Sequence, residues 1–558
     1  MNIKEYINEK VKNILHLSDN VVVEVPPKDD MGDYSIQCAN YRTEELKSPM
    51  DVAKYISEHF VDDKHYFKDI KLMGPYINFY LNYDVLSSYV ISAIENEKSS
   101  YGSSYEGEGD SLLVEHTSIN PNAEPHIGRC RNSLIGDFLS NLYQFLGYSV
   151  ERHYYINDLG KKIALLIIGI ETYGLSDESF SSILDVYVKI SKDVKEDSSI
   201  EEKAFLYLEK VESGDKEMIH KFKSITDKCV QGQLKIFAEL NIHFDIFTHE
   251  SDYVYDRSGI DAVLEKLKGK GRLKEDELGR YYVDLTGYDI PTKEPVLVLT
   301  RSNKTTLYPM KDILYTIYKM KRNPNHNFIV LGEDQAVYMQ QISAVLDILG
   351  YSSPKLISYS YVLLDGGKMS TSGGTVVLVT EFMKAVKEKL EENLSSRGEV
   401  ISSSDLQRLC NASIKFTMLN VSKNKIVNFN LEKSTSFTGE SGIYILYSIV
   451  RINSILKNVE KTSTDNLQFI HPIEHKIIRQ LYQFPDVIQE LLQSYEPAHL
   501  TKYLFNLTQL FSKFYEQITI LHEEDIDLKA SRVRLVCAIK TVLENGLKIL
   551  GIDSIDHM

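Results

Sequence analysis

The strongest constraint on this chain's fold is an alternation of strand and helix signals that begins at residue 111. An apolar strand at 111–118 (SLLVEHTS) is followed by apolar residues at helical spacing, by a glycine suited to end a helix, and by a second strand at 149–156 (SVERHYYI). Two strands joined through a helix form a parallel pair. The alternation returns in further strands and helices at 294–300, 308–322, 327–332, 336–350 and 355–364. The pattern predicts an α/β fold with a parallel, Rossmann-like sheet.

Changes in pattern along the chain predict three domains. Residues 1–105 mix strand-like and helical runs and end in a segment rich in Ser, Gly and acidic residues, which is typical of a linker. We interpret them as a small α+β N-terminal domain. The parallel-sheet domain is expected at 106–375, with a largely helical, charged insertion at about 170–290. From 376 to 558 strand signals fade and helical patterns dominate, which predicts an all-α C-terminal bundle.

Composition excludes several classes of protein. No run of eighteen apolar residues occurs, so no membrane span is expected. The first ten residues, MNIKEYINEK, lack the apolar core of a signal peptide, so we expect a cytoplasmic protein. The five cysteines include no Cys-x-x-Cys pair, which argues against zinc and against a disulfide scaffold. The net charge of −16 disfavours binding to nucleic acid in general but leaves room for a local basic face.

The turn between the first strand and its helix has the chemistry of a phosphate site. Its sequence, NPNAEPHIGRCRN, spans 120–132, and we expect Pro125 to open the helix. A helix that begins beyond a parallel strand points free N–H groups at any anion. His126 and Arg129 share one face of the first turn, while Gly128 allows a ligand to approach the backbone. A capped helix with exposed His and Arg side chains remains the alternative.

A second stretch offers a lysine on a glycine-rich loop. The segment 363–377 (LLDGGKMSTSGGTVV) follows the last expected strand and contains Lys368 among glycines and small hydroxyl residues. Such a loop can bring its lysine onto a polyphosphate. The alternative is a flexible turn with a solvated lysine.

Together the two stretches resemble the paired signature motifs of class I aminoacyl-tRNA synthetases. Further stretches narrow the resemblance to the arginyl family, and they occur in the family's order over nearly the whole chain: MGDYSIQCA, GPYINFYL, YYINDLG, FDIFTHESDYV, TTLYPMKDILYT, IVLGEDQ and TGESGIYILYSIVRINSIL. The resemblance implies ATP-dependent ligation of L-arginine to its tRNA through an arginyl-adenylate. It also implies that activation requires bound tRNA, that Mg²⁺ accompanies ATP, and that the protein is a monomer.

The resemblance implies roles for residues of both motifs. It assigns His126, Arg129 and Lys368 to catalysis, and it assigns ATP contacts to Gly128, Asp334, Met369 and Ser370. The sequence departs from the family pattern in both motifs, and Ala123 or Glu124 replaces a basic residue that is often found shortly before the first motif. Arg129 stands where a second histidine is usual, and Thr371 stands where a second lysine is usual. We hypothesise that Arg129 supplies the missing positive charge, because a guanidinium stays charged at any physiological pH.

An arginine pocket needs carboxylates, because a guanidinium offers five N–H donors and no acceptor. The arginine-binding residues implied by the family are Glu115, Asn120, Tyr308, Asp312 and Gln335. Tyr308 and Asp312 are four residues apart, so they share a helix face. The alternatives are that Glu115 pairs with a basic neighbour and that Asp312 only complements a helix dipole.

The tRNA-binding residues implied by the family are Asn78 in the N-terminal domain and Tyr444, Tyr447 and Arg451 in the helical domain. Aromatic rings can stack on unpaired bases, and Arg can pair with phosphate. Packing roles for these residues remain open. Three other functions also remain: a nucleotidylyltransferase, which needs no long helical C-terminal region; a zinc-dependent synthetase, for which no ligands are visible; and a non-catalytic tRNA-binding protein.

Overall fold

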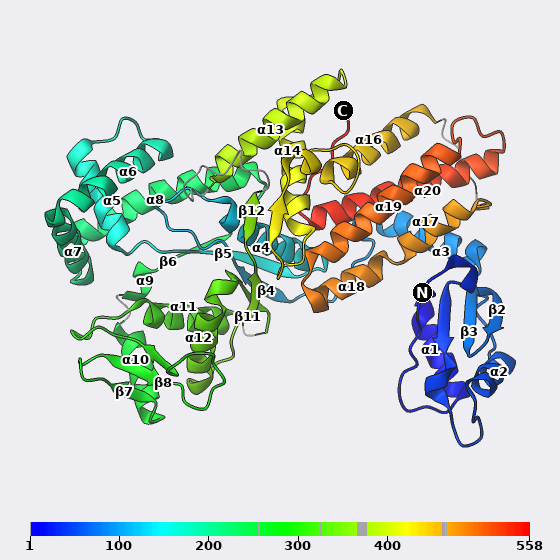
Figure 1. Ribbon diagram of the computed structural model, residues 1–558, viewed down its shortest axis with the longest axis horizontal. Coiled ribbons are helices and arrows are strands. Elements are labelled where there is room, and N and C mark those ends of the chain that lie inside the picture. Colours follow the sequence, from blue (N-terminus) through cyan, green and yellow to red (C-terminus); the bar gives the residue numbers. More distant parts are fainter. Residues whose placement is uncertain are drawn as a thin grey trace. The chain divides into compact units, whose positions relative to one another are not determined.

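The computed structural model describes residues 2–254, 257–323, 325–364, 377–459, 464 and 466–557. Figure 1 labels the helices and strands of the chain, which forms two compact units. Unit 1 comprises Met1–Tyr101, Arg451–Pro485 and Asn506–Leu543, and unit 2 comprises Gly102–Val450, Asp486–Phe505 and Glu544–Met558.

A five-stranded parallel sheet forms the centre of unit 2, which confirms the predicted fold class. In spatial order its strands are β11 (Lys355–Tyr359), β10 (Asn327–Gly332), β4 (Ser111–Glu115), β5 (Ser149–Ile156) and β6 (Ile246–His249). Helix α4 (Ile127–Phe145) connects β4 to β5, and Gly147 follows it with φ +93°. The strand order reverses between β4 and β10. In open parallel sheets such a reversal is where ligands bind, beyond the carboxyl ends of the strands.

Two strands lie in places that the sequence did not indicate. The strand expected at 294–300 is β9 (Val296–Val298), but it belongs to an antiparallel sheet with β7 (Leu273–Glu275) and β8 (Tyr281–Asp284) rather than to the parallel sheet. Conversely, β6 lies within the expected helical insertion, yet it pairs with β5 in the parallel sheet. A short apolar run has the same local pattern in either sheet, because partner choice depends on distant residues.

The strand expected at 355–364 is divided in two. Its first part is β11, and its second part, β12 (Val362–Leu364), pairs with β13 (Val427–Phe429). β13 lies in a region that we expected to be wholly helical. With three residues, it is too short to give a period-two signal.

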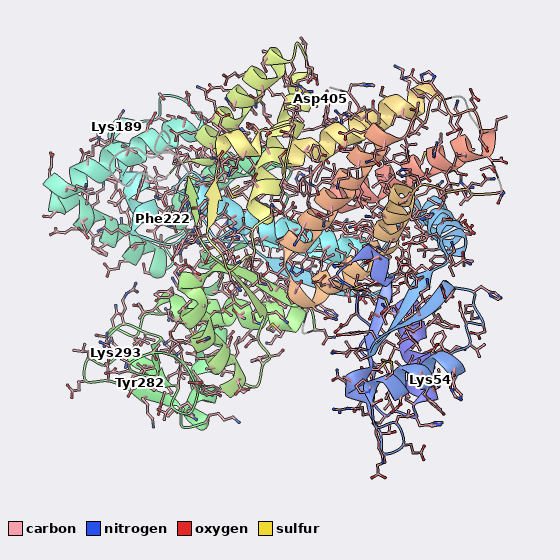
Figure 2. All side chains as sticks on the ribbon, turned by 45° about the vertical axis from the view of Figure 1, so that its right-hand side comes forward. Lys54, Lys189, Phe222, Tyr282, Lys293 and Asp405 are labelled. Atoms are coloured by element: carbon pink, nitrogen blue, oxygen red, sulfur yellow. The ribbon has the colours of Figure 1, made fainter. Side chains whose placement is uncertain are left out.

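Helices make up most of the rest of unit 2. The helical layer of the expected insertion is α5 (Lys161–Tyr173), α6 (Phe180–Glu196), α7 (Ser198–Glu212) and α8 (Lys216–Glu239). These helices share one apolar core, in which Phe222 is buried, whereas Lys189 points to solvent (Figure 2). A second apolar core joins α10 (Arg257–Gly269), α11 (Tyr308–Arg322) and α12 (Ala336–Ile348) to β8 and β9.

A buried lysine ties the segment around Gly551 into unit 2. The Nζ of Lys415, in α14 (Ser403–Leu419), lies 3.0 Å from Asp137 Oδ2 on α4 and donates to the carbonyl of Gly551 at 2.7 Å. Gly551 has φ +68°, and a Cβ there would lie 2.3 Å from the Asp137 carboxylate. Only glycine fits this position, because both the backbone conformation and the close approach exclude a side chain.

Unit 1 contains a small antiparallel sheet with strand order β1-β3-β2. Its elements up to residue 97 are α1 (Ile3–Ile14), β1 (Tyr34–Gln37), α2 (Pro49–His59), β2 (Phe67–Met73), β3 (Tyr76–Leu81) and α3 (Tyr83–Glu97). The strand-like run at 20–25 forms only the isolated bridge of Glu24 with Ser35. Helix α17 (Pro472–Tyr482) packs against α3, and Arg479 lies 3.2 Å from Asp33.

Long helices form the C-terminal part, as predicted. They are α13 (Val379–Ser396), α14, α16 (Gly442–Asn458), α17, α18 (Phe484–Ser494), α19 (Pro497–Gln517) and α20 (Ile526–Ile549). Among the described helices, none combines the length and apolarity needed to cross a membrane. All five cysteines are free thiols, and all but Cys537 are buried.

Candidate active site

A cavity of about 210 Å³ lies beyond the carboxyl ends of the parallel strands, at the reversal of strand order. Glu115 reaches it from the end of β4, Tyr155 from β5, and Ile329 from β10. Helices α11 and α12 supply most of the remaining wall. All five predicted arginine-binding residues line this one cavity: Glu115, Asn120, Tyr308, Asp312 and Gln335.

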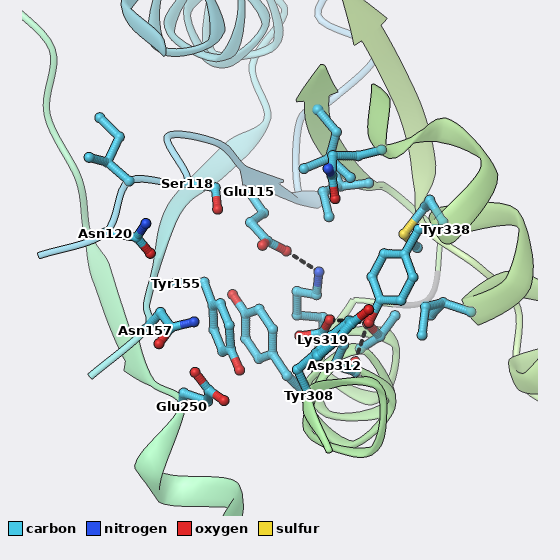
Figure 3. Close-up of a pocket in the computed structure, with 18 residues that line it drawn as sticks. Glu115, Ser118, Asn120, Tyr155, Asn157, Glu250, Tyr308, Asp312, Lys319 and Tyr338 are labelled. Atoms are coloured by element: carbon cyan, nitrogen blue, oxygen red, sulfur yellow. Dashed lines mark hydrogen bonds and ion pairs between the residues drawn. The ribbon is translucent and has the colours of Figure 1, made fainter. Parts of the chain in front are cut away.

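Carboxylates enter the cavity from three directions (Figure 3). Glu115 ends β4, Asp312 lies in the first turn and a half of α11, and Glu250 directly follows β6. Glu250 is 3% exposed, and Glu115 is 8% exposed. Buried carboxylates need positive partners or strong hydrogen bonds, because removing a charge from water is costly.

Each carboxylate has a different partner. Lys319 Nζ contacts Glu115 Oε2, and Lys311 Nζ lies 2.6 Å from Glu250 Oε1. The Asp312 carboxylate accepts a hydrogen bond from the Tyr338 hydroxyl. Among the described residues, Glu115 and Glu250 each contact a lysine, whereas the Asp312 carboxylate accepts from a neutral hydroxyl.

These surroundings favour the protonated form of Asp312. Burial raises the pKa of Asp312 to about 7; the Tyr338 hydrogen bond opposes the rise, while the charges of Glu250 and Glu115 add to it. Burial also raises the pKa of Glu250, and the Lys311 ammonium opposes that rise. A cation bound beside Asp312 would favour its ionised form.

The mouth of the cavity is more open than its floor. Tyr308 is 59% exposed, with its ring centroid 5.4 Å from that of Tyr338, and Asn120 is also exposed. A side chain of α8 nevertheless fixes the backbone at the mouth. The buried Gln233 donates to the carbonyls of Asn120 at 3.0 Å and Ala123 at 2.7 Å. This amide fixes the path of the chain between β4 and α4.

The predicted phosphate turn lies beside this mouth, but its helix starts two residues later than expected. Pro125 does not open the helix: its carbonyl accepts from Val379 N at 2.8 Å, and α4 begins at Ile127. The pairing with another segment keeps the backbone before Ile127 extended. His126 is therefore the N-cap residue, and its own side chain makes no capping bond.

His126 and Arg129 lie close together at this helix start. Burial, followed by the Arg129 charge, lowers the pKa of His126, so its imidazole is neutral at pH 7. Burial raises the pKa of Tyr359, at the end of β11, and the adjacent Arg129 guanidinium opposes that rise. His126, Gly128 and Arg129 are each partly exposed, so this turn is accessible to a ligand.

Lys368, Met369 and Ser370 lie outside the described residues, as does the whole segment 365–376. The described residues that follow it meet the phosphate turn directly. Ile127 N donates to Val377 O at 3.0 Å, and His126 forms an antiparallel bridge with Leu378. The chain that follows the second motif thus pairs with the first motif.

Asp334 and Gln335 occupy a short 3₁₀ turn, η4 (Glu333–Gln335), at the end of β10. Gln335 Nε2 donates to Asp334 Oδ2 at 3.0 Å, which places the exposed Asp334 next to a cavity residue. A Cβ on Gly332 would lie 2.4 Å from Asp334 Oδ1, so the absence of a side chain there makes room for this carboxylate.

Arg131 connects the phosphate turn to the C-terminal end of the sheet, and sequence reasoning missed it. Its side chain is fully buried within α4. The guanidinium donates to four backbone carbonyls at 2.7 to 3.0 Å, those of Ser360, Val421, Ser422 and Lys425. One side chain thereby fixes the start of α4 against Ser360, between β11 and β12, and against residues 421–425, between α14 and β13.

The predicted tRNA-binding residues occupy two elements. Asn78 lies in β3 of unit 1; it is 3% exposed, and its Nδ2 contacts Met73 Sδ at 3.0 Å. Tyr444, Tyr447 and Arg451 recur at helical spacing on α16, and all three are half-buried. Arg397 lies over the Tyr447 ring at 5.1 Å, and Arg451 lies over Tyr515 at 5.5 Å.

Two further charged residues of the cavity were missed at the sequence level. Glu250 directly follows β6, a strand that we interpreted as part of a helical insertion. Lys319 is seven residues after Asp312 on α11, a spacing that places both on one helix face. In the described part of the chain, no group of three or more His, Cys, Asp or Glu side chains is arranged to hold a metal ion.

Comparisons with known proteins agree with this geometry. Family models match residues 1–81 (arginyl tRNA synthetase N terminal domain), 90–432 (tRNA synthetases class I (R), catalytic domain) and 445–558 (DALR anticodon binding domain). The arginine–tRNA ligase of Methanocaldococcus jannaschii is 32% identical over 99% of this chain and 98% of that protein. The arginine–tRNA ligase of Methanococcus maripaludis is 31% identical over 98% of this chain and 97% of that protein.

A solved structure has the same fold. The arginyl-tRNA synthetase of Thermus thermophilus superposes with a TM-score of 0.82 at 22% identity, covering 100% of both chains. The family models, the two relatives and the cavity with its carboxylates lead to one conclusion: this chain belongs to the class I arginyl-tRNA synthetase family.

Proposed function

We propose that this protein ligates L-arginine to its tRNA at the expense of ATP, through an arginyl-adenylate. The observation that carries the proposal is the shared cavity. The five residues that the family resemblance assigns to arginine line it together, at the reversal of strand order. A third carboxylate, Glu250, lines it as well.

The cavity suits a guanidinium because it offers acceptors where that group has only donors. We assign Asp312, Glu250 and Glu115 to the substrate side chain, with Asp312 as the principal partner because its own hydrogen bond comes from a neutral hydroxyl. Hydrogen bonds to charged groups contribute about 1.5–3 kcal/mol each. Citrulline has no positive charge, and the lysine ammonium lacks the planar arrangement of N–H donors that a guanidinium has. We expect discrimination of about 10⁴-fold against them, as in other sites built on hydrogen bonds.

The first chemical step joins arginine to ATP. An oxygen of the arginine carboxylate attacks the α-phosphorus, the bond to the bridging oxygen breaks, and pyrophosphate leaves. No protein nucleophile is required, so catalysis comes from positioning and from stabilising charge on the phosphates. We assign Asn120 to the α-amino end of arginine. His126, Arg129, Gly128 and the N–H groups at the start of α4 are assigned to the phosphates.

Further ATP contacts are proposed for Asp334 and for Lys368, Met369 and Ser370. Arg129 is proposed to supply the charge that the family usually places on a second loop lysine. Mg²⁺ would enter as part of the ATP substrate complex, as is usual at phosphate sites.

The second step transfers arginine to tRNA. In class I enzymes the 2′-hydroxyl of the terminal adenosine attacks the carbonyl carbon of the adenylate, and AMP leaves. We assign tRNA contacts to Asn78, Tyr444, Tyr447 and Arg451. We further propose that arginine activation requires bound tRNA and that the protein acts as a cytoplasmic monomer.

The deciding experiment is charging of total tRNA with each of the twenty amino acids. The expected product is arginyl-tRNA alone. Charging with another amino acid would contradict the substrate assignment, and no charging at all would favour a non-catalytic tRNA-binding protein. Pyrophosphate exchange with and without tRNA tests the activation requirement, which predicts exchange only when tRNA is present.

A further inference from the structure

A lysine inside a cavity built for a cation calls for an explanation. The Lys319 side chain is 1% exposed, and its Nζ contacts Glu115 Oε2. It also lies 4.5 Å from the centroid of the Tyr315 ring. Figure 3 shows Lys319 in the cavity wall, between Glu115 and Asp312. An ammonium this close to a bound guanidinium would repel it unless another group neutralised the ammonium.

Burying such an ammonium costs several kcal/mol, and a buried ion pair often contributes little net stability. The pair therefore needs a reason other than stability. The charges at the cavity suggest one: of the described groups, the carboxylates of Glu115, Glu250 and Asp312 face the ammoniums of Lys311 and Lys319. Each lysine contacts a different glutamate, so one negative charge is left over for the substrate.

We propose that Lys319 is a positioning residue for arginine binding. It holds one oxygen of Glu115, leaves the other for the substrate, and keeps Asp312 as the carboxylate that the guanidinium neutralises. The inference rests on the proposed function, because it assigns Lys319 to the same substrate site. Lys319 acts through Glu115 and does not itself contact the reacting atoms.

Helix α11 makes this arrangement possible. Asp312 and Lys319 are seven residues apart, two turns along one face of α11. Asp312 thus lines the cavity one turn after Tyr308, while Lys319 reaches the end of β4. Tyr315 lies between Asp312 and Lys319 in the sequence. Its aromatic ring provides a surface on which the Lys319 ammonium is favoured. A single helix face carries both the group that binds the substrate and the group that orients Glu115.

A double-mutant cycle tests the inference. Lys319→Met leaves Glu115 buried without its cation, and we expect the KM for arginine to rise about 10- to 100-fold. The kcat at saturating arginine and the KM for ATP should change by less than about threefold, because the phosphate turn is untouched. Glu115→Gln should also raise the KM for arginine. If Lys319 acts through Glu115, adding Lys319→Met to Glu115→Gln should change that KM by less than about threefold.

The controls separate binding from folding. Lys321→Met makes the same change on the exposed face of α11 and should leave all three kinetic constants unchanged. Thermal unfolding identifies a variant that fails to fold. If Lys319→Met alone does not fold, the comparison of the double variant with Glu115→Gln still tests the inference. The double variant has neither charge of the pair, so no buried charge is left without its partner.

Three results would overturn the inference. One is an unchanged KM for arginine in folded Lys319→Met. Another is multiplicative losses in the double variant, which would mean that Lys319 acts independently of Glu115. The third is an equal rise in the KM for ATP. If the unaltered protein does not charge tRNA with arginine, the proposed function itself fails, and that result is distinct from all three.

Discussion

The arginine cavity and the phosphate turn lie side by side at the same end of the sheet, yet they are built differently. In the cavity, charged side chains are buried and paired with each other, as Glu115 is with Lys319. In the turn, His126 and Arg129 are partly exposed, and the order comes from the backbone pairing of Ile127 with Val377 and from Arg131 behind it. Under the proposed function, side-chain charge would select the amino acid, whereas backbone placement would prepare the turn for a polyphosphate.

The comparison predicts its largest effect at the cavity. Asp312→Asn keeps the shape of the side chain but replaces the carboxylate by a neutral amide with N–H donors. We expect kcat/KM for arginine to fall about 10³-fold, since a site with mismatched donors rejects its ligand strongly. The KM for ATP should stay within about threefold of its original value. A loss shared equally between arginine and ATP would show that the two regions are not separable.

Arg129→His tests the other region. The change replaces a permanent charge by an imidazole at the start of α4, and we expect the rate of adenylate formation to fall about 10²-fold. Single-turnover measurements of pyrophosphate release should show the loss in the rate constant rather than in the KM for arginine. Unchanged kinetics would contradict the proposal that Arg129 supplies the missing positive charge at the phosphates.

The dependence of the KM for arginine on pH should come from Asp312. With the pKa of Asp312 near 7 in the empty protein, the carboxyl is protonated at lower pH, and a guanidinium must displace that proton to bind. The KM for arginine should therefore rise about tenfold per pH unit below about pH 7 and level off above it.

Calorimetry of arginine binding to the tRNA complex should show proton release in the same acidic range. The Asp312→Asn variant is the control, because it should lose this pH dependence. A similar pH dependence of the KM for ATP would assign the titration to another group.

The smallest effect is expected at the cavity mouth. Tyr308 is 59% exposed, so Tyr308→Phe keeps the ring and removes only a hydroxyl near solvent. The KM for arginine should rise by less than about fivefold, because an exposed neutral hydrogen bond contributes only about 1 kcal/mol. An effect as large as that of Asp312→Asn would mean that the mouth closes over the substrate.

The sequence predicted the site better than it predicted the sheet. The family resemblance assigned Glu115 and Asp312 to one pocket, and their local positions agreed with it: Glu115 at a strand end and Asp312 near a helix start. Glu250 was missed because IFTH at 246–249 is too short and too polar to be recognised as a parallel strand. Had it been recognised, the acid directly after it would have been expected at the same edge of the sheet.

Lys319 and Arg131 were missed for another reason. Both are charged residues within amphipathic helices, where charge usually indicates a solvent-exposed face. Their burial depends on acceptors that are distant in sequence, Glu115 in one case and the carbonyls of Val421, Ser422 and Lys425 among others in the second. Local spacing gives no access to such partners.

The contact of Lys415 with Gly551 has a consequence for synthesis. Translation proceeds from the N-terminus, so the helix that carries Lys415 and its partner Asp137 leave the ribosome long before residue 551. Until then an ammonium destined for the interior lacks one of its acceptors. A nascent chain can fold most of this unit during elongation, but the contact of Lys415 with Gly551 cannot form until residue 551 has been synthesised.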